Sequence, residues 1–206
     1  MGTVTQLRQT PKTGKSLPPR RIPNRECRSR EHLTPEEVDA LMAAAGKVGR
    51  HGHRDATLIL LAYRHGLRVS ELVALRWDQV DLKRGTLHVN RLKNGTPSTH
   101  PLRGPELRAL RRLKREYADH PYLFVSERRG PLTTASVRKI IARAGDDAGV
   151  GFPVHPHMLR HACGFYLANK GIDTRAIQVY MGHRNIQHTT VYTELTPHRF
   201  KDFWSD

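Results

Sequence analysis

A tyrosine close to the C-terminal end of the chain, Tyr192, could act as a nucleophile, because basic residues able to activate it precede it in the sequence. These residues are Arg68, Lys93, His157, Arg160 and His183. A tyrosine hydroxyl has a pKa of about 10, so it attacks only when a base removes its proton or cations stabilise the phenolate. Paired guanidinium groups can neutralise the charge that develops on a phosphoryl group. This combination predicts DNA strand transfer through a phosphotyrosine, without a metal.

Each of these residues also has a common structural role when it is considered alone. Tyr192 could be a half-buried core residue. Arg68 could form an i,i+3 ion pair with Glu71, and Lys93 could simply keep a strand edge soluble. His183 could interact with the dipole at the C-terminal end of a helix. The combination and order of the residues, rather than any one of them, therefore indicates an active site.

His157 and Arg160 lie three residues apart, so they share one face of a predicted helix, where they could also form a surface ion-pairing face. His157 and His161 are four residues apart and could instead hold a metal ion. However, a zinc protease motif needs glutamate after its first histidine, and this chain has Met158 there. We therefore expect a site without a metal ion.

The charge of the whole chain indicates a polyanionic partner. Its 206 residues carry a formal net charge of +16 and the sequence pI is about 10.6. Such a charge attracts DNA, RNA or acidic membrane surfaces. No apolar run approaches a membrane span, and two cysteines do not make a disulfide framework. We expect a cytoplasmic protein that binds nucleic acid and does not bind a membrane.

Residues 1–30 differ in composition from the rest of the chain. They contain eight lysine and arginine residues, four prolines and a single acidic residue, Glu26. Such a segment cannot bury a core, so we expect a basic, disordered N-terminal arm over residues 1–30 and one catalytic domain over residues 31–206. The arm could contact DNA, or it could only increase solubility.

Helical signals begin the folded part. Thr34 and Glu37 form a capping box that predicts a first helix. A second helix, over about residues 54–65, is apolar almost all round, which predicts burial at the centre of the fold. A short helix over residues 69–75 follows at once. Arg68 therefore lies on the tight bend between two helices.

From residue 77 the hydrophobic period becomes that of strands. Apolar residues alternate at 80–82 and 87–89, and the chain returns over residues 96–102 after the hairpin turn Asn94-Gly95. This pattern predicts a three-stranded antiparallel sheet. Lys93 directly precedes this turn and is expected on an exposed tip.

The rest of the chain has helical patterns. We expect helices over residues 106–117, 134–148, 156–170 and 174–181, a short helical piece with Tyr192, and a last apolar turn with Phe200, Phe203 and Trp204. The predicted fold class is therefore mainly α with a small three-stranded antiparallel sheet (α+β).

The six residues, taken in order, resemble the active-site signature of the tyrosine recombinases, also called the phage integrase family. The motifs that carry the resemblance are His-Gly-Leu-Arg68-Val-Ser-Glu-Leu, Pro-His157-Met-Leu-Arg160-His, Met-Gly-His183 and Tyr192. It extends from about Leu33 to the C-terminus. It is closest to the short, stand-alone recombinases related to the fimbrial phase-variation invertases, and it implies the tyrosine recombinase catalytic-domain fold.

The resemblance implies a mechanism. Tyr192 would attack the scissile phosphate and leave a 3′-phosphotyrosyl bond and a free 5′-hydroxyl, and the 5′-hydroxyl of a partner strand would reverse the step. Arg68 and Arg160 would hold the non-bridging oxygens, for which lysine lacks the planar fork. Because bond energy is conserved in such a step, neither ATP nor a cofactor or metal ion is implied.

The remaining residues would move protons and support the phosphate. Lys93 would protonate the leaving 5′-oxygen as general acid. His157 would assist proton transfer at the attacking hydroxyl, and His183 would hydrogen-bond the phosphoryl group. Glu71 would support Arg68, because the family also favours a carboxylate at this place.

The implied partners are double-stranded DNA, further copies of the chain in a homo-tetramer on two DNA sites, and an accessory DNA-bending protein. Most family members carry a helical core-binding domain before the catalytic one, whereas here only the basic segment of about thirty residues precedes it. The arm or a partner would then hold the far side of the duplex.

Two other functions compete with a recombinase that inverts, integrates or excises DNA. Residues 60–75 could form a helix-turn-helix in a non-catalytic DNA-binding regulator, which would explain the charge but not the rest of the six residues. A monomeric topoisomerase would share the nucleophile and the chemistry. Supercoil relaxation without strand exchange would distinguish it.

Overall fold

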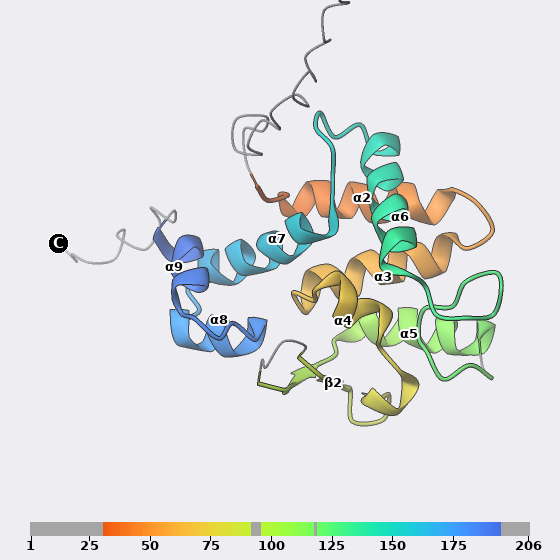
Figure 1. Cartoon of the computed structure of the whole chain (residues 1–206), viewed down its shortest axis with the longest axis horizontal. Coiled ribbons are helices and arrows are strands. Elements are labelled where there is room, and N and C mark those ends of the chain that lie inside the picture. Colours follow the sequence, from red (N-terminus) through yellow and green to blue (C-terminus); the bar gives the residue numbers. More distant parts are fainter. Residues whose placement is uncertain (1–30, 92–95, 118, 195–206) are drawn as a thin grey trace, which may run out of the picture.

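In the computed structural model, helices form most of the chain that the structure describes, residues 31–91, 96–117 and 119–194 (Figure 1). The helices are α2 (Pro35–Lys47), α3 (Gly52–Arg64), α4 (Val69–Val73), α5 (Gly104–Glu116), α6 (Thr134–Asp147), α7 (Pro156–Asn169), α8 (Thr174–Met181) and α9 (Gln187–Glu194). With one three-stranded antiparallel sheet, this architecture confirms the predicted fold class.

The central helix of the fold is α3, which packs against α2, α5 and α7. Its residues Leu58, Ile59 and Leu61 are fully buried, as its apolar sequence predicted. Gly66 follows this helix with a φ of +56°, and a Cβ atom there would lie 2.5 Å from Met181 Sδ. A left-handed backbone and this close approach both require glycine. The chain therefore turns tightly and places Arg68 at the start of α4.

The predicted capping box begins α2. Thr34 Oγ1 accepts a hydrogen bond from the Glu37 main-chain N–H at 3.3 Å, and Glu37 Oε2 accepts one from the Thr34 N–H at 2.9 Å. Other helix ends differ slightly from the predictions: α3 begins two residues earlier, and α4 ends at Val73. Such shifts are expected because helix ends depend on tertiary packing as well as on local sequence.

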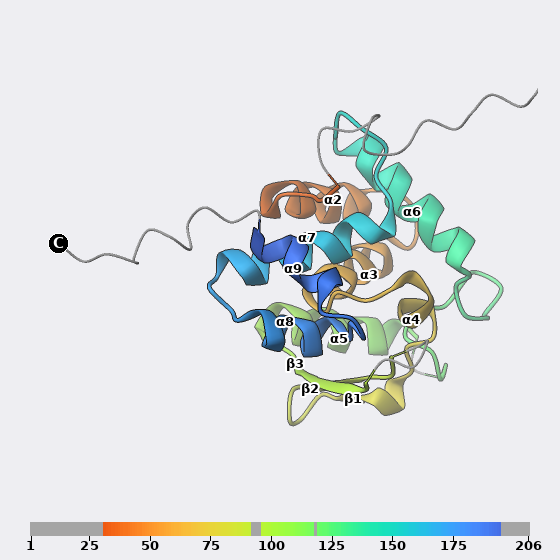
Figure 2. The same ribbon diagram turned by 60° about the vertical axis from the view of Figure 1, so that its left-hand side comes forward.

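The sheet consists of β1 (Val80–Asp81), β2 (Thr86–Val89) and β3 (Ser98–Pro101), paired in the order β1-β2-β3. The second ladder ends where Val89 pairs with Ser98, so the strands are shorter than predicted. Lys93 and the predicted Asn94-Gly95 turn lie outside the described residues. Since β3 contacts α8, the sheet lies beside the helices at the C-terminal end of the described chain (Figure 2).

Helices α7, α8 and α9 pack on one another and form a small apolar cluster of their own. Its buried members are Cys163, Ala168, Ile177, Met181 and Tyr192. This packing brings together residues that are far apart in the sequence. Within the described ranges, every helix is too short or too polar to cross a membrane. The predicted arm over residues 1–30 and the predicted turn at residues 200–204 lie outside these ranges.

Candidate active site

The bend between α3 and α4 holds Arg68 through Glu71. The Arg68 main-chain N–H donates to Glu71 Oε2 at 2.9 Å, and its Nη1 donates to Glu71 Oε1 at 2.7 Å. The Glu71 side chain is only 1% exposed, whereas that of Arg68 is 30% exposed. One buried carboxylate thus orients both the backbone and the guanidinium of Arg68, and this guanidinium remains accessible to a ligand.

Helix α7 brings Arg160 to the same place. Its guanidinium donates to the carbonyl of Gly66 and, at 2.6 Å, to the carbonyl of Met181. It also lies 4.0 Å from Glu71 Oε2. Burial, reinforced by the neighbouring arginines, lowers the pKa of Arg160 to about 10. The side chain is therefore still protonated at neutral pH.

A third guanidinium, that of Arg91, was not among the residues predicted from the sequence. Its side chain is fully buried. Its Nη1 donates to Glu71 Oε2 at 2.9 Å, and its Nη2 donates to the carbonyls of His65 and Tyr180. A basic residue just after a strand normally faces solvent, so no local signal in the sequence distinguished this arginine. Its burial comes from the packing of α8 against the sheet.

We call the group of four residues Arg68, Arg91, Arg160 and Glu71 the arginine cluster. The three guanidiniums donate to three successive carbonyls at the end of α8, those of Gly182, Tyr180 and Met181 respectively. These carbonyls carry the partial negative charge of a helix C-terminus. Three guanidiniums and one carboxylate leave a formal charge of +2 on the cluster. Such a cluster favours an anion of the phosphodiester type.

His183 follows α8 directly and lies beside the arginine cluster. Gly182 ends the helix with a φ of +63°, and a Cβ atom there would lie 2.7 Å from Arg91 Cδ, so the turn needs glycine. His183 Nδ1 lies 2.8 Å from the hydroxyl of the buried Thr189, which fixes the orientation of the ring. Burial and the nearby Arg160 lower the pKa of His183 to about 3. The imidazole is therefore neutral at neutral pH and has one donor and one acceptor nitrogen.

Tyr192 lies on α9 and is 1% exposed. Its ring packs edge-to-face against Phe165 and His161, with centroid distances of 5.1 and 5.7 Å. Burial raises the pKa of Tyr192 to about 12, although the charges of Arg160 and Arg68 act in the opposite direction. The hydroxyl is thus protonated at neutral pH, within the electrostatic reach of both arginines, and covered from solvent.

The close packing of Tyr192 predicts a stability effect at Gly164, on α7. A Cβ atom at this position would lie 2.4 Å from Tyr192 Cε2. We expect Gly164→Ala to lower the free energy of unfolding by about 1–3 kcal/mol, the usual cost of overpacking. Urea denaturation measures this change. Gly151→Ala is the matched control, because a Cβ atom at Gly151 has no neighbour within 4 Å. Equal stability of the two variants would contradict the predicted overpacking.

His157 is exposed in the first turn of α7, and its ring contacts His161 at a centroid distance of 4.3 Å. His161 in turn contacts Tyr192. Burial lowers the pKa of His161 to about 4, so its imidazole is a neutral proton acceptor at neutral pH. From the sequence, His161 was expected only as a possible metal ligand, although its i,i+4 spacing from His157 already placed both residues on one helix face.

An open depression of about 620 Å³ adjoins Arg68 and His183. Two further arginines, Arg175 and Arg184, also line it, and none of its lining side chains is acidic. Gln178 holds Arg175 in place by accepting a hydrogen bond from its Nη1 at 2.8 Å. A polyanion could therefore approach the exposed side of Arg68 without charge repulsion.

The structure thus brings Arg68, Arg160, His183 and Tyr192 together from four separate segments, with His157 at the rim. Lys93, the sixth predicted residue, lies outside the described residues.

Residues 31–199 match the model of the phage integrase family. The type 1 fimbriae regulatory protein FimE of Escherichia coli (strain K12) is 46% identical over 181 residues, which cover 85% of this chain and 91% of FimE. The crystal structure of XerA recombinase superposes with a TM-score of 0.72 at 29% identity, covering 81% of this chain and 61% of that chain.

The same fold occurs in the site-specific recombinase XerH, solved in a post-cleavage complex with its palindromic difH substrate. The TM-score is 0.71, and the superposition covers 82% of this chain and 51% of the XerH chain. At 23% identity this likeness concerns the fold alone. The chain spans between about half and three fifths of the length of these two solved recombinases.

Proposed function

We propose that this chain, which belongs to the phage integrase family and to the tyrosine recombinases, cuts and rejoins DNA with Tyr192 as its nucleophile. The observation that carries this proposal is the meeting of Arg68, Arg160 and His183 beside the buried Tyr192. The direct test is a covalent protein–DNA adduct on a nicked duplex, detected by denaturing electrophoresis.

Double-stranded DNA is the proposed partner. The formal net charge of +16 and the depression beside Arg68, which has no acidic lining residue, both suit a polyanion. The DNA complex of the structurally similar XerH adds support. We also propose a homo-tetramer on two DNA sites, aided by an accessory DNA-bending protein. Sedimentation of the protein with a duplex that carries two sites tests this assembly.

In the proposed step, Tyr192 Oη forms a bond to phosphorus while the bond from phosphorus to the 5′-oxygen breaks. The phenol proton passes to a neutral histidine. His161 is the histidine whose ring lies nearest to that of Tyr192, and His157 packs against His161. The leaving 5′-oxygen takes a proton from Lys93. One phosphoester bond replaces another, so the reaction requires no external energy source.

The arginine cluster supplies the proposed electrostatic stabilisation. A phosphodiester that enters beside Arg68 brings one negative charge to a group with a formal charge of +2. Arg68 and Arg160 are then proposed to grip the non-bridging oxygens, and His183 to donate a further hydrogen bond. Because Tyr192 is only 1% exposed, its hydroxyl can reach a phosphate only after α9 moves or the side chain rotates.

Within this proposal, Arg91 acts as a positioning residue that holds Glu71 and the end of α8. We expect Arg91→Met to slow adduct formation by about 100-fold at saturating DNA, because Glu71 and the carbonyl of Tyr180 lose a partner and Arg68 shifts. DNA affinity should change much less, since Arg91 itself is fully buried. Single-turnover kinetics and a binding titration separate the two quantities.

The matched control for this variant is Arg112→Met on α5, which removes an exposed arginine that is paired with Glu116. Partial recovery in Arg91→Lys, or in Arg91→Ala supplied with guanidinium, would exclude simple misfolding. If affinity fell as much as the rate, the positioning role would be wrong.

A further inference from the structure

A group of buried polar side chains lies behind the arginine cluster and has no role in the step proposed above. His65 directly follows α3, His100 lies on β3, and Glu106 lies in the first turn of α5. Each of the three residues is 1% exposed. Burial of polar and charged groups is unfavourable unless they have partners. The contacts of these three residues, which we call the histidine–glutamate network, therefore indicate what the network does.

The Glu106 carboxylate is held by three partners. Its Oε2 accepts hydrogen bonds from the Arg103 main-chain N–H at 2.9 Å and from Arg64 Nη1 at 3.0 Å. Its Oε1 lies 2.8 Å from His65 Nε2, in a close polar contact rather than an aligned hydrogen bond. Burial raises the pKa of the Glu106 carboxyl, but the contacts with His65, Arg103 and Arg64 outweigh burial and lower it below its ordinary value. The group is therefore a carboxylate at neutral pH.

The two histidines of the network contact each other directly. Their Nδ1 atoms lie 3.1 Å apart, so one ring donates a hydrogen bond and the other accepts it. His100 Nε2 lies 2.8 Å from Ser98 Oγ on the same strand. Burial, reinforced by His65 and Arg91, lowers the pKa of His100 to about 3, so its ring is neutral at neutral pH. Each ring nitrogen of the pair thus faces a polar partner, and the two rings are fixed relative to each other.

Tyr180 connects the network to the last turn of α8. Its ring stacks on that of His100 at a centroid distance of 3.9 Å. Its hydroxyl donates to the Arg64 carbonyl at 2.8 Å and lies 3.4 Å from His65 Nδ1. The end of α3 and the end of α8 are therefore joined through buried side chains.

The main chain of the same residues leads to the arginine cluster. The carbonyls of His65 and Tyr180 both accept hydrogen bonds from Arg91 Nη2, that of His65 at 3.4 Å. Arg91 Nη1 donates to Glu71 Oε2 at 2.9 Å, and the same oxygen accepts from the Arg68 main-chain N–H. A displacement of His65 would therefore reach Arg68 through a continuous chain of hydrogen bonds.

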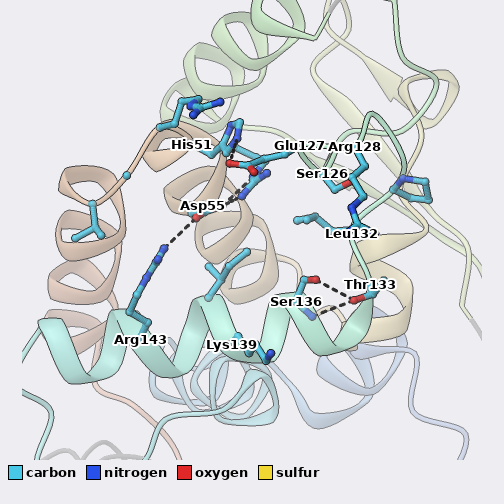
Figure 3. A pocket seen from close by; sticks show the side chains of 16 residues that line it. His51, Asp55, Ser126, Glu127, Arg128, Leu132, Thr133, Ser136, Lys139 and Arg143 are labelled. Atoms are coloured by element: carbon cyan, nitrogen blue, oxygen red, sulfur yellow. Dashed lines mark hydrogen bonds and ion pairs between the residues drawn. The ribbon is translucent and has the colours of Figure 1, made fainter.

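A second buried carboxylate, that of Asp55, provides a comparison. It lies 2.7 Å from Arg54 and 3.6 Å from Arg143, so it joins α3 to α6 beside a hollow of about 570 Å³ (Figure 3). Within the described ranges, none of these three residues is hydrogen-bonded or ion-paired to a member of the arginine cluster. The Asp55 group thus joins two helices, whereas the histidine–glutamate network also binds a residue of the candidate site.

We propose that His65, His100 and Glu106 are positioning residues, which hold Arg91 and, through it, Glu71 and Arg68 in place for strand transfer. The inference rests on the proposed function in taking a phosphate as the ligand of Arg68. Because the network is buried, it contributes to the rate of the chemical step rather than to DNA affinity.

The test variant is His65→Phe, which keeps a flat ring and removes both nitrogens. We expect the Arg68 amide to exchange with solvent about 10-fold faster than in the wild type, because Glu71 is held less firmly. Hydrogen exchange followed by NMR measures this rate without DNA. The adduct should form about 10-fold more slowly at saturating DNA, with little change in affinity, which is the scale for loss of a partner behind a contact residue. Single-turnover kinetics and a binding titration measure these two quantities.

The control is Arg54→Met, on the same helix as the residue that precedes His65. It removes the cation beside the buried Asp55, just as His65→Phe removes the ring beside the buried Glu106. It should lower the midpoint of thermal unfolding and leave exchange of the Arg68 amide unchanged.

Two further variants distinguish positioning from general damage. His65→Gln should recover part of the rate, because its amide can occupy the place of Nε2 beside Glu106. In an Arg91→Met background, His65→Phe should slow adduct formation by less than about threefold, because its effect passes through Arg91. If His65→Phe does not fold, His100→Asn replaces it in every comparison except the rescue by His65→Gln, since its amide can still meet His65 Nδ1 while the contact with Ser98 is lost.

Unchanged exchange of the Arg68 amide in His65→Phe would overturn the proposal, and so would an equal acceleration in Arg54→Met. A full 10-fold loss of rate from His65→Phe in the Arg91→Met background would show that the network does not act through Arg91. Since exchange is measured without DNA, it decides whether the network holds the cluster even when no adduct forms. A wild-type protein without an adduct would contradict the proposed function alone.

Discussion

Tyr192→Phe is expected to abolish the covalent adduct with a nicked duplex that carries the recombination site. The loss should be roughly 10⁶-fold, the scale found when an enzyme loses its nucleophile. Phenylalanine keeps the ring that packs against Phe165 and Gly164 and removes only the hydroxyl. Folding and DNA affinity should therefore stay close to those of the wild type. Denaturing electrophoresis of the reaction detects the adduct as a species of lower mobility.

The control for this variant is Tyr166→Phe, which removes the hydroxyl of a tyrosine that is 42% exposed on the neighbouring helix α7. It should form the adduct at the rate of the wild type. An adduct that persists in Tyr192→Phe would show that another side chain attacks the phosphate, and the proposed mechanism would be wrong.

Arg160→Lys is expected to give the second largest effect, a fall of about 10³-fold in the rate of adduct formation at saturating DNA. This is the scale for the loss of a preorganised donor to a developing charge. Lysine keeps the positive charge beside Glu71. It lacks the planar guanidinium, which can donate to the carbonyls of Gly66 and Met181 and to a phosphate oxygen at the same time. Single-turnover kinetics measures the change.

Thermal unfolding of Arg160→Lys must accompany the kinetics, because Arg160 is 1% exposed and links α7 to both α8 and the bend after α3. Retained unfolding behaviour with a large loss of rate is the expected result. A rate within threefold of the wild type would mean that the guanidinium does not stabilise the transition state.

The parts of the fold that depend on neighbours in the sequence were predictable. Thr34 and Glu37 form their capping box across three residues, and the apolar run from Leu58 to Ala62 is the buried centre of α3. The bend that carries Arg68 follows from Gly66, whose left-handed backbone ends the preceding helix. Each of these features is decided by residues within about one or two helical turns.

The environment of the candidate site was less predictable. Nothing near Arg91 in the sequence indicates that its side chain is fully buried against Glu71, twenty residues earlier in the chain. Tyr192 was expected to be poised for attack, but the structure covers it with residues of α7. Of the two histidines of α7, His161 contacts the Tyr192 ring, whereas His157 contacts His161.

The sequence by itself determined the chemistry available to this protein: which side chains carry charge or titrate, in what order, and on which local helix or bend each lies. Only the tertiary structure decided their surroundings. Contacts such as those of Arg160 with Gly66 and Met181 join segments up to 94 residues apart. They form because α3, α7 and α8 pack together, and that packing also sets the burial that raises the pKa of Tyr192 and lowers that of His183.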